Sequence, residues 1–213
     1  MAIKKHDFVE IDYTGKLKDS GDVYDTTTEA KAKEADIFAE NNEYKPVIIC
    51  IGEGFILKGI DDFVENKEPG DYSVEIKAEN AFGKKDAKLI QMIPASKFKE
   101  QKIDPVPGLR LNIDGTIGMV RTVTGGRILV DFNHPLAGQD VIYELKVKRV
   151  VTDKKEQVQA LLKSLLGLRD VEVEIKEDKA HIKLPAELPA QILDELKKKI
   201  KELAKVDPEF AKK

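Results

Sequence analysis

The chain has 213 residues, of which 41% are hydrophobic and 35% are charged. This balance is typical of a folded globular protein with a charged surface and excludes an intrinsically disordered chain. Lysine and arginine total 36 against 39 aspartate and glutamate residues, a net charge of -3, which gives no electrostatic reason to expect a nucleic acid or a membrane as the main partner.

The sequence predicts a cytoplasmic protein. No run approaches the roughly 20 apolar residues that a membrane span requires, and the charged start at 1–7 does not have the apolar stretch of a signal peptide. Cys50 is the single cysteine, so no intramolecular disulfide can form, and its apolar neighbours predict a buried, inert thiol.

The N-terminal part of the chain predicts strands and one short helix. Apolar residues alternate over 8–17, and after a turn the next extended segment starts at Val23, so a hairpin is expected. The stretch 27–42 predicts an exposed helix or a long loop. A buried strand is predicted at 47–51, and a short helix with one apolar face at 56–64.

Two more alternating segments, 72–76 and 141–151, complete a predicted antiparallel sheet, so the fold class is α+β. Between them, residues 84–128 differ in composition and pattern: they include several prolines and two short alternating runs, at 109–113 and 117–123. We predict that this stretch is a small β-rich module inserted into the core.

The remainder of the chain predicts a helix, two strands and a second helix. Leucines and Val158 repeat at helical spacing up to Gly167, which is a natural end for a helix. Apolar residues then alternate over 171–175 and 180–184, which predicts two strands. Pro189 is well placed to begin the last helix. A unit of about 60 residues is marginally stable alone. We therefore predict a separate C-terminal α-β-β-α domain at 152–213, with homodimerisation as its leading role and with loose final residues.

Three motifs resemble those of the FKBP-type peptidyl-prolyl cis-trans isomerases. Residues 9–27 look like the opening of that domain, with Tyr, Thr-Gly, an acidic turn, and then an aromatic followed by Asp and hydroxyl residues. Residues 51–61 are similar to its Gly turn into a short helix, and 81–83 to the aromatic-Gly pair where its flap begins.

A fourth motif at 133–139 is similar to the end of the flap in the SlyD-like branch of the family, which carries an insert-in-flap chaperone domain where 84–128 falls. The resemblance therefore implies an FKBP-like sheet wrapped on a short helix, formed by 1–83 and 129–151, with a chaperone module between them.

The resemblance also implies a proline pocket that uses no cofactor. Its catalytic residues would be Tyr13, Tyr24, Asp25, Leu57, Phe82 and Tyr143. Val47, Ile56 and Ile60 would add substrate contacts, and the backbone N–H of Leu57 would hold the substrate carbonyl. The three histidines are scattered and no CxxC or HxxxH spacing occurs, so no metal site is predicted.

Two alternatives stay open for these residues. Aromatic residues on alternating strands are core residues by default, and only the family motifs favour a pocket here. The chain has no Trp, which many family members place at the pocket floor, and Ile60 stands there instead. A non-catalytic holdase or assembly scaffold that binds proline-containing segments is therefore the alternative function.

The inserted module carries more apolar residues than so small a core can easily bury. The family resemblance favours the binding of client chains by the apolar residues that the module cannot bury. The predicted client-binding residues are Leu89, Ile90, Met92, Ile93 and Met119. The alternative is that they fill the core of the module. The leading prediction is an isomerase with a chaperone arm, whose partners are unfolded or nascent polypeptides with X-Pro bonds.

Overall fold

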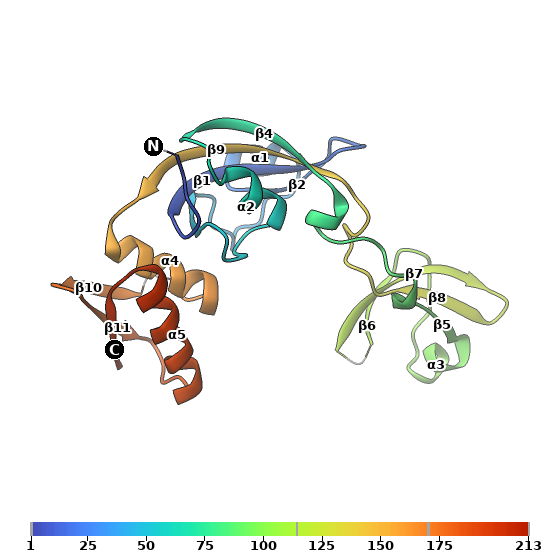
Figure 1. Ribbon diagram of the computed structural model, residues 1–213. Helices are drawn as coiled ribbons and strands as arrows, with labels where there is room; N and C mark the ends of the chain where they lie inside the picture. The colour runs from blue at the N-terminus through green and yellow to red at the C-terminus, as the bar shows by residue number, and fades with distance from the viewer. Residues whose placement is uncertain (1, 114, 170, 213) are drawn as a thin grey trace. The chain divides into compact units, whose positions relative to one another are not determined.

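The computed structural model describes residues 2–113, 115–169 and 171–212 (Figure 1). The chain divides into two compact units, 1–77 together with 140–213, and 78–139. The second unit interrupts the first in sequence, as an inserted module does, and it is wider than the predicted stretch 84–128. None of the described helices is long and apolar enough to cross a membrane.

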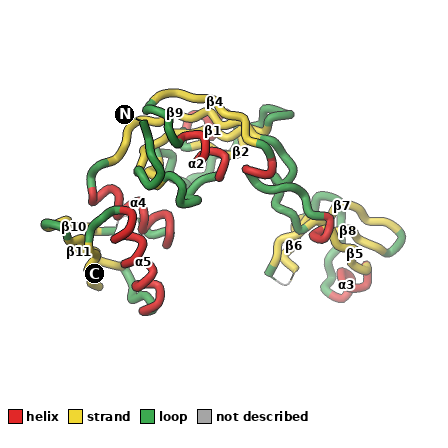
Figure 2. The backbone as a smooth tube through the Cα atoms, in the orientation of Figure 1, coloured by secondary structure: helices red, strands yellow, loops and turns green. Residues whose placement is uncertain are grey.

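An antiparallel sheet of five strands lies at the centre of the first unit (Figures 1 and 2). β1 (Phe8–Leu17) has β9 (Val141–Val151) on one side, and both β2 (Val23–Thr26) and β3 (Val47–Cys50) on the other. β4 (Gly70–Ile76) pairs with the far edge of β9. The long alternating runs predicted at 8–17 and 141–151 thus become the two central strands, because each is paired along both edges.

One face of this sheet is covered by α2 (Lys58–Val64), whose Ile60 and Val64 are fully buried. Helix and sheet approach closely at Gly59, where a Cβ would lie 2.4 Å from Cγ2 of Ile76. The stretch 27–42 contains only the short helix α1 (Glu29–Glu34) and otherwise forms a loop.

The second unit contains a four-stranded sheet in the order β5-β8-β7-β6. Its elements are the short 3-10 helices η1 (Ala78–Asn80) and η2 (Ala87–Leu89), the helix α3 (Ala95–Glu100), and the strands β5 (Ile90–Pro94), β6 (Arg110–Ile113), β7 (Thr116–Thr124) and β8 (Arg127–Asp131). The predicted boundary after residue 128 falls inside β8. This strand belongs to the module because Ile128 and Val130 are fully buried in its core and pair with both neighbouring strands.

The C-terminal segment has the predicted helix–strand–strand–helix order, followed by one more strand. It comprises α4 (Lys154–Leu166), β10 (Glu172–Lys176), β11 (Lys179–Leu184), α5 (Ala190–Leu203) and β12 (Asp207–Lys212). The side chain of Asp153 caps α4 by accepting a hydrogen bond from the N–H of Glu156 at 2.9 Å, and Gly167 ends the helix in a left-handed conformation.

The prediction of loose final residues is wrong. β12 pairs in parallel with β11, Val206 and Pro208 are buried, and Glu209 pairs with both Lys179 and His181. The short stretch after α5 gave no clear alternation, so its strand is specified by the exposed edge of β11 rather than by its own sequence pattern.

The C-terminal segment shares a hydrophobic cluster with the central sheet. Phe8, Cys50 and Val151 pack in one cluster with Leu161 and Leu162 of α4. Two ion pairs add to this contact, Glu43 with Lys163 at 3.0 Å and Glu53 with Lys199. At this end the sheet is therefore covered on both faces, which explains why the consecutive residues Phe8 and Val9 are both buried.

Candidate active site

The register of three strands brings four of the predicted catalytic residues around Gly15. On β1, Gly15 lies opposite Asp25 of β2 and opposite Tyr143 of β9. A Cβ at Gly15 would lie 2.9 Å from the ring and hydroxyl of Tyr24 and 3.0 Å from the ring of Tyr143. Only glycine leaves room for both rings over this strand, so this position determines how closely the aromatic side chains assemble.

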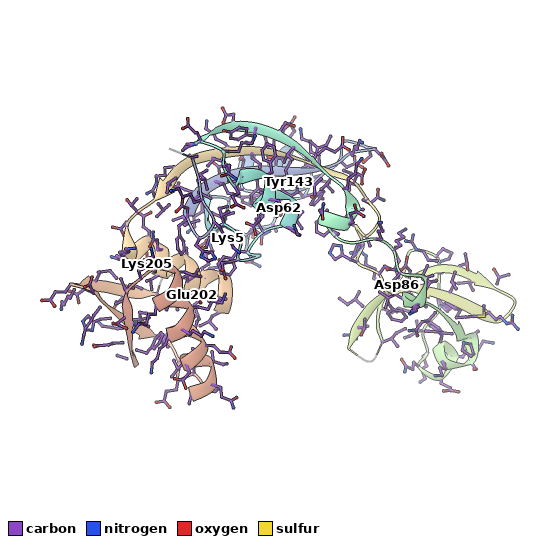
Figure 3. All side chains as sticks on the ribbon, viewed as in Figure 1. Lys5, Asp62, Asp86, Tyr143, Glu202 and Lys205 are labelled. Carbon is purple, nitrogen blue, oxygen red and sulfur yellow. The ribbon has the colours of Figure 1, made fainter. Side chains whose placement is uncertain are left out.

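The tyrosine side chains contact each other and Asp25 directly. The Tyr13 hydroxyl donates a hydrogen bond to Oδ2 of Asp25 at 3.1 Å. The ring of Tyr143, which is 3% exposed, lies 5.7 Å from that of Tyr13 and 6.1 Å from that of Tyr24, tilted by 54° and 81° respectively. Figure 3 shows the side chains of the molecule and labels Tyr143. Edge-on packing of this kind is favourable for aromatic rings. We call Tyr13, Tyr24, Asp25 and Tyr143 the tyrosine pocket.

Burial keeps the hydroxyls of this pocket protonated. It raises the pKa of Tyr24 to about 12 and raises the pKa values of Tyr13 and Tyr143 above the ordinary tyrosine range, with nearby Asp25 adding to each. Burial also raises the pKa of Asp25, although the hydrogen bond from Tyr13 partly offsets it. The pocket therefore presents neutral hydroxyl donors and a single acidic group.

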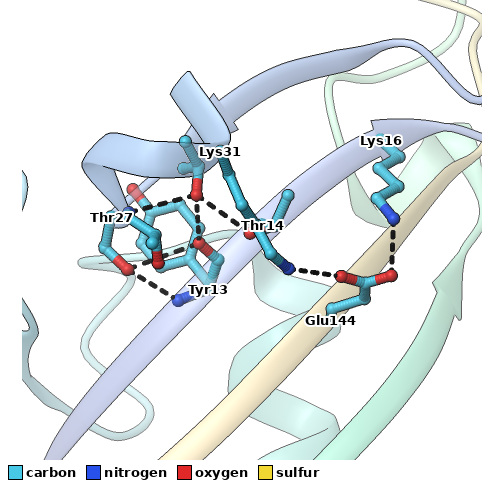
Figure 4. Close-up of polar contacts among 8 residues, drawn as sticks. Tyr13, Thr14, Lys16, Thr27, Lys31 and Glu144 are labelled. Carbon is cyan, nitrogen blue, oxygen red and sulfur yellow. Dashed lines mark hydrogen bonds and ion pairs between the residues drawn. The ribbon is translucent and has the colours of Figure 1, made fainter. Parts of the chain in front are cut away.

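A set of threonine hydroxyls, which we did not predict as site residues, holds Tyr13 in place (Figure 4). The carbonyl of Tyr13 accepts from Oγ1 of Thr26 and from the N–H of Thr27, both at 3.0 Å, and its N–H donates to Oγ1 of Thr27 at 2.9 Å. Oγ1 of Thr26 also lies 2.9 Å from Oγ1 of Thr14. The signal in the sequence was the pair of hydroxyl residues directly after Asp25, which marked the family motif but not their role.

A second contact in the same region ties the sheet to α1. Glu144 on β9 accepts hydrogen bonds from Lys16 at 2.5 Å and from Lys31 at 2.7 Å (Figure 4). These bonds lower the pKa of Glu144. The bridge joins β1, β9 and α1 beside the tyrosine pocket.

The loop before α2 carries the predicted residues Ile56 and Leu57, both half-buried, and Leu57 directly precedes the helix. The carboxylate of Asp61, 6% exposed, holds this loop by accepting the N–H of Gly54 at 3.2 Å. Gly52 and Gly54 both have left-handed φ angles, of 81° and 71°, which favour glycine. Asp61 is thus a second positioning residue that the sequence analysis did not single out.

The remaining predicted pocket residues fall into three places. Ile60 is fully buried beneath the sheet. Val47 and Ile56 line a groove of about 450 Å³ together with Tyr13 and residues of α4. Phe82 belongs to the second compact unit, where its ring stacks on His134 with the ring centroids 4.7 Å apart.

The structure places three of the predicted client-binding residues on one face of the second unit. Ile90 and Met119 both lie opposite Asp131 of β8, and Met92 lies opposite Leu129. Met92 is 59% exposed, and Ile117, on the same side of β7 as Met119, is 67% exposed. We call Ile90, Met92, Ile117, Met119 and Leu129 the insert face.

Leu89 and Ile93 lie elsewhere in the second unit. Leu89 is 41% exposed in η2, just before β5. Ile93 packs against the core formed by Phe98, Val120 and Ile128, because successive residues of a strand point to opposite faces of its sheet.

Side-chain hydrogen bonds close the base of this unit. Asn133 donates to the carbonyl of Asp86 and to Oδ1 of Asp131, and its own oxygen accepts the N–H of Asp86 at 2.8 Å (Asp86 is labelled in Figure 3). Burial would raise the pKa of Asp131, but the bonds from Asn133 and Arg121 outweigh it and hold this pKa low. The strands that enter and leave the module are thereby joined.

Comparisons with known proteins identify the family. The family described as FKBP-type peptidyl-prolyl cis-trans isomerase matches residues 1–99, and the FKBP26 IF domain matches residues 91–136. A short-type peptidyl-prolyl cis-trans isomerase of Methanocaldococcus jannaschii is 34% identical over 155 residues, which cover 72% of this chain and 98% of that protein.

Two bacterial groups of relatives are more distant. The FKBP-type 16 kDa peptidyl-prolyl cis-trans isomerase of Escherichia coli K12 is 27% identical, covering 70% of this chain and 94% of that protein. The SlyD isomerase of Yersinia pestis is 30% identical, covering 54% of this chain and 60% of that protein. With its sheet wrapped on a short helix and its match to the archaeal isomerase over nearly the full length of that protein, the chain belongs to the FKBP-type peptidyl-prolyl cis-trans isomerase family.

Proposed function

We propose that X-Pro bonds are isomerised in the tyrosine pocket, with Ile56 and Leu57 as its helix-side wall. The observation that carries this proposal is the gathering of Tyr24, Asp25 and Tyr143 around Gly15. A pure core cluster would not require a carboxylate hydrogen-bonded among the rings, whereas a binding pocket combines apolar walls with a few polar groups.

The chemistry suits such a pocket. Rotation about an X-Pro bond meets a barrier of roughly 20 kcal/mol because amide resonance must be broken. The twisted amide carries less charge separation than the planar one, so apolar walls favour it over the ground state. No covalent bond is made or broken, and the reaction therefore needs positioning rather than a nucleophile.

The polar groups of the pocket then orient the twisted chain. The neutral hydroxyl of Tyr24 is a donor for a substrate carbonyl. The N–H of Leu57, at the start of α2, is the proposed holder of the carbonyl that precedes proline. Asp25 keeps the hydroxyl of Tyr13 in one orientation.

We further propose that the insert face holds unfolded clients. An apolar surface that is open on a sheet, with two methionines that adapt their shape, suits varied and extended chains. Holding a chain there raises the effective concentration of its prolines at the isomerase site, since both are on one polypeptide.

Refolding assays test both parts of the proposal. We expect the chain to accelerate isomerisation of an X-Pro tetrapeptide and the proline-limited refolding of a protein. Replacing residues 84–137, between the hydrogen-bonded Gly83 and Gly138, by a short flexible loop should greatly reduce the second rate and leave the first nearly unchanged. Absence of acceleration by the folded protein on either substrate would contradict the isomerase site.

The non-catalytic scaffold remains the second candidate, favoured by the fully buried aliphatic Ile60 at the pocket floor. Tyr24→Ala separates the two functions. An isomerase should lose its rate acceleration in this variant, whereas a scaffold should keep its full suppression of aggregation and show no catalytic change.

We propose that the C-terminal segment mediates homodimerisation. Leu165 of α4 and Ile192 of α5 are 38% and 36% exposed and line one groove, together with other leucines and with charged residues of α5. Leu165→Asp together with Ile192→Asp should convert a dimer into a monomer in sedimentation at micromolar concentration, with Lys155→Asp as the control on the same helix. A monomeric unmodified protein would contradict this assignment.

A further inference from the structure

The groove lined by Tyr13, Val47 and Ile56 is formed by two parts of the first unit. One wall comes from β3 and its flanking loops, including Pro46 and Phe55, and the opposite wall comes from α4 and the residues just after it. Its volume, about 450 Å³, lies within the range of pockets that hold small ligands or short peptide segments. We call it the α4 groove.

The two walls are held together by contacts within the chain. Lys163 of α4 pairs with Glu43 at 3.0 Å, and α4 packs through Leu161 into the cluster that contains Phe8. Nε2 of Gln159 donates to the carbonyl of Val171 at 3.0 Å, which fixes the chain after the helix. The groove is therefore preformed, and a segment that enters it does not have to reorder its walls.

The α4 groove is continuous with the tyrosine pocket. Tyr13 lines the groove and donates a hydrogen bond to Asp25 in the pocket, and Ile56 directly precedes Leu57 at the helix start. A polypeptide is longer than its proline ring, and each extended residue spans up to about 3.6 Å. The residues next to a bound proline must pass over the neighbouring surface, and this groove opens there.

The charges along the groove have a net positive sign. Lys45 and Lys163 share one carboxylate, that of Glu43, whose pKa their hydrogen bonds lower to about 2. Glu156 already pairs with Arg149 at 2.6 Å. The described residues give Arg169, which is exposed on the α4 side, no carboxylate partner.

We propose that the α4 groove binds the substrate segment adjacent to the proline and favours an acidic side chain in it, with Arg169 as the specificity-determining residue. This inference rests on the proposed function of the tyrosine pocket. The C-terminal segment would then take part in substrate selection by the isomerase domain to which it is attached.

Peptide kinetics test the proposal. The full chain is assayed for kcat/KM on a proline tetrapeptide and on longer peptides that carry Glu or Lys residues on one side of the proline, with each side tested separately. We expect the Glu peptide to exceed the Lys peptide on one side by about twofold to fivefold, the range that an exposed ion pair supplies. The tetrapeptide, which is too short to fill the groove, is the internal reference.

Two variants and one control assign the effect to the groove. Arg169→Glu should reverse the preference, and Ser164→Trp, at an exposed groove position, should lower kcat/KM for the long peptides alone. Lys155→Glu makes the same change of charge on α4 outside the groove and should change neither.

The possible failures are distinguishable. If the tetrapeptide is isomerised normally but the Glu preference is absent, or is equal in Arg169→Glu and Lys155→Glu, the groove assignment is overturned and the proposed function stands. If the folded protein fails to isomerise the tetrapeptide, the proposed function and the inference fail together.

Discussion

The tyrosine pocket and the insert face both lie on antiparallel strands, yet they differ in how far their side chains are buried. In the pocket, Tyr143 is 3% exposed, and it packs against two other tyrosines around one glycine. On the insert face, Met92 and Ile117 are 59% and 67% exposed. The side chains of the first surface pack tightly against one another, whereas those of the second stay open to solvent.

The two surfaces differ in burial because different elements cover the two sheets. The pocket lies where the sheet curves over α2 and where threonine hydroxyls hold the strand of Tyr13 in place. The insert sheet has its core, with Phe98 of α3, on one side only. Rigid enclosure suits the selective binding of a proline ring, and an uncovered sheet suits contact with many unfolded chains.

Gly15→Ala should produce the largest effect on the pocket. The added Cβ meets the rings of Tyr24 and Tyr143 at 3.0 Å or less, so both must move. A displacement of about 1 Å in a catalytic site can lower the rate by about a hundredfold, and we expect a tetrapeptide kcat/KM loss of that order. Gly70→Ala is the control, because its Cβ would meet nothing closer than 3.5 Å. A folded Gly15→Ala protein with normal activity would show that these rings do not form the site.

Met92→Lys combined with Ile117→Lys should impair client binding by the insert face and leave the tyrosine pocket unaffected. Each change removes apolar contact area worth about 1 kcal/mol to a bound client, so the two together should lower the client-dependent acceleration of refolding by about thirtyfold. The tetrapeptide rate should not change. Val106→Lys, at a residue that is 51% exposed in a loop outside the sheet, is the matched control. Equal losses in both proteins would mean that the insert face is not a distinct binding surface.

Asp25→Asn should have a smaller effect on activity, about threefold, because an amide oxygen can still accept the hydrogen bond from Tyr13. Its effect on stability depends on pH. Burial raises the pKa of Asp25, so the folded state holds this proton more tightly than the unfolded state. The stabilisation is complete below the unfolded pKa near 3.9 and is lost as the pH rises through the folded pKa.

Urea unfolding at several pH values measures that dependence. The free energy of unfolding of the unmodified protein, relative to Asp25→Asn, should decrease as the pH rises from about 3.5 and then become constant. Asp19→Asn, in the exposed turn before β2, makes the same substitution outside the tyrosine pocket and is measured as the control. A relative stability that increases with pH would contradict a desolvated Asp25.

The local patterns predicted the elements well, because alternation and helical spacing depend only on neighbouring residues. The runs at 8–17 and 141–151 became β1 and β9, and Gly167 ended α4. The predicted pocket residues Tyr13, Tyr24, Asp25 and Tyr143 do lie together. Their functional assignment came from the motifs, since periodicity alone would have made these tyrosines core residues.

Other features depend on contacts between residues far apart in sequence. The strand β12 forms on the free edge of β11, and the boundary at residue 128 could not be placed without the pairing of β8 with β5 and β7. Ile93 faces the core of the insert and Met92 does not, because α3 covers only the face of the insert sheet to which Ile93 points. No local pattern contains that information.

The sequence alone was enough for the α+β class, the family resemblance, and the main strands and helices of the first unit other than β12. The tertiary structure decided what surrounds them: the threonines that hold Tyr13, the carboxylate of Asp61 beneath its loop, and the α4 groove beside Val47. The physical reason is the range of the interactions. Backbone conformation and amphipathic pattern are local, whereas the walls of the α4 groove are joined by Glu43 and Lys163, which lie 120 positions apart in the sequence.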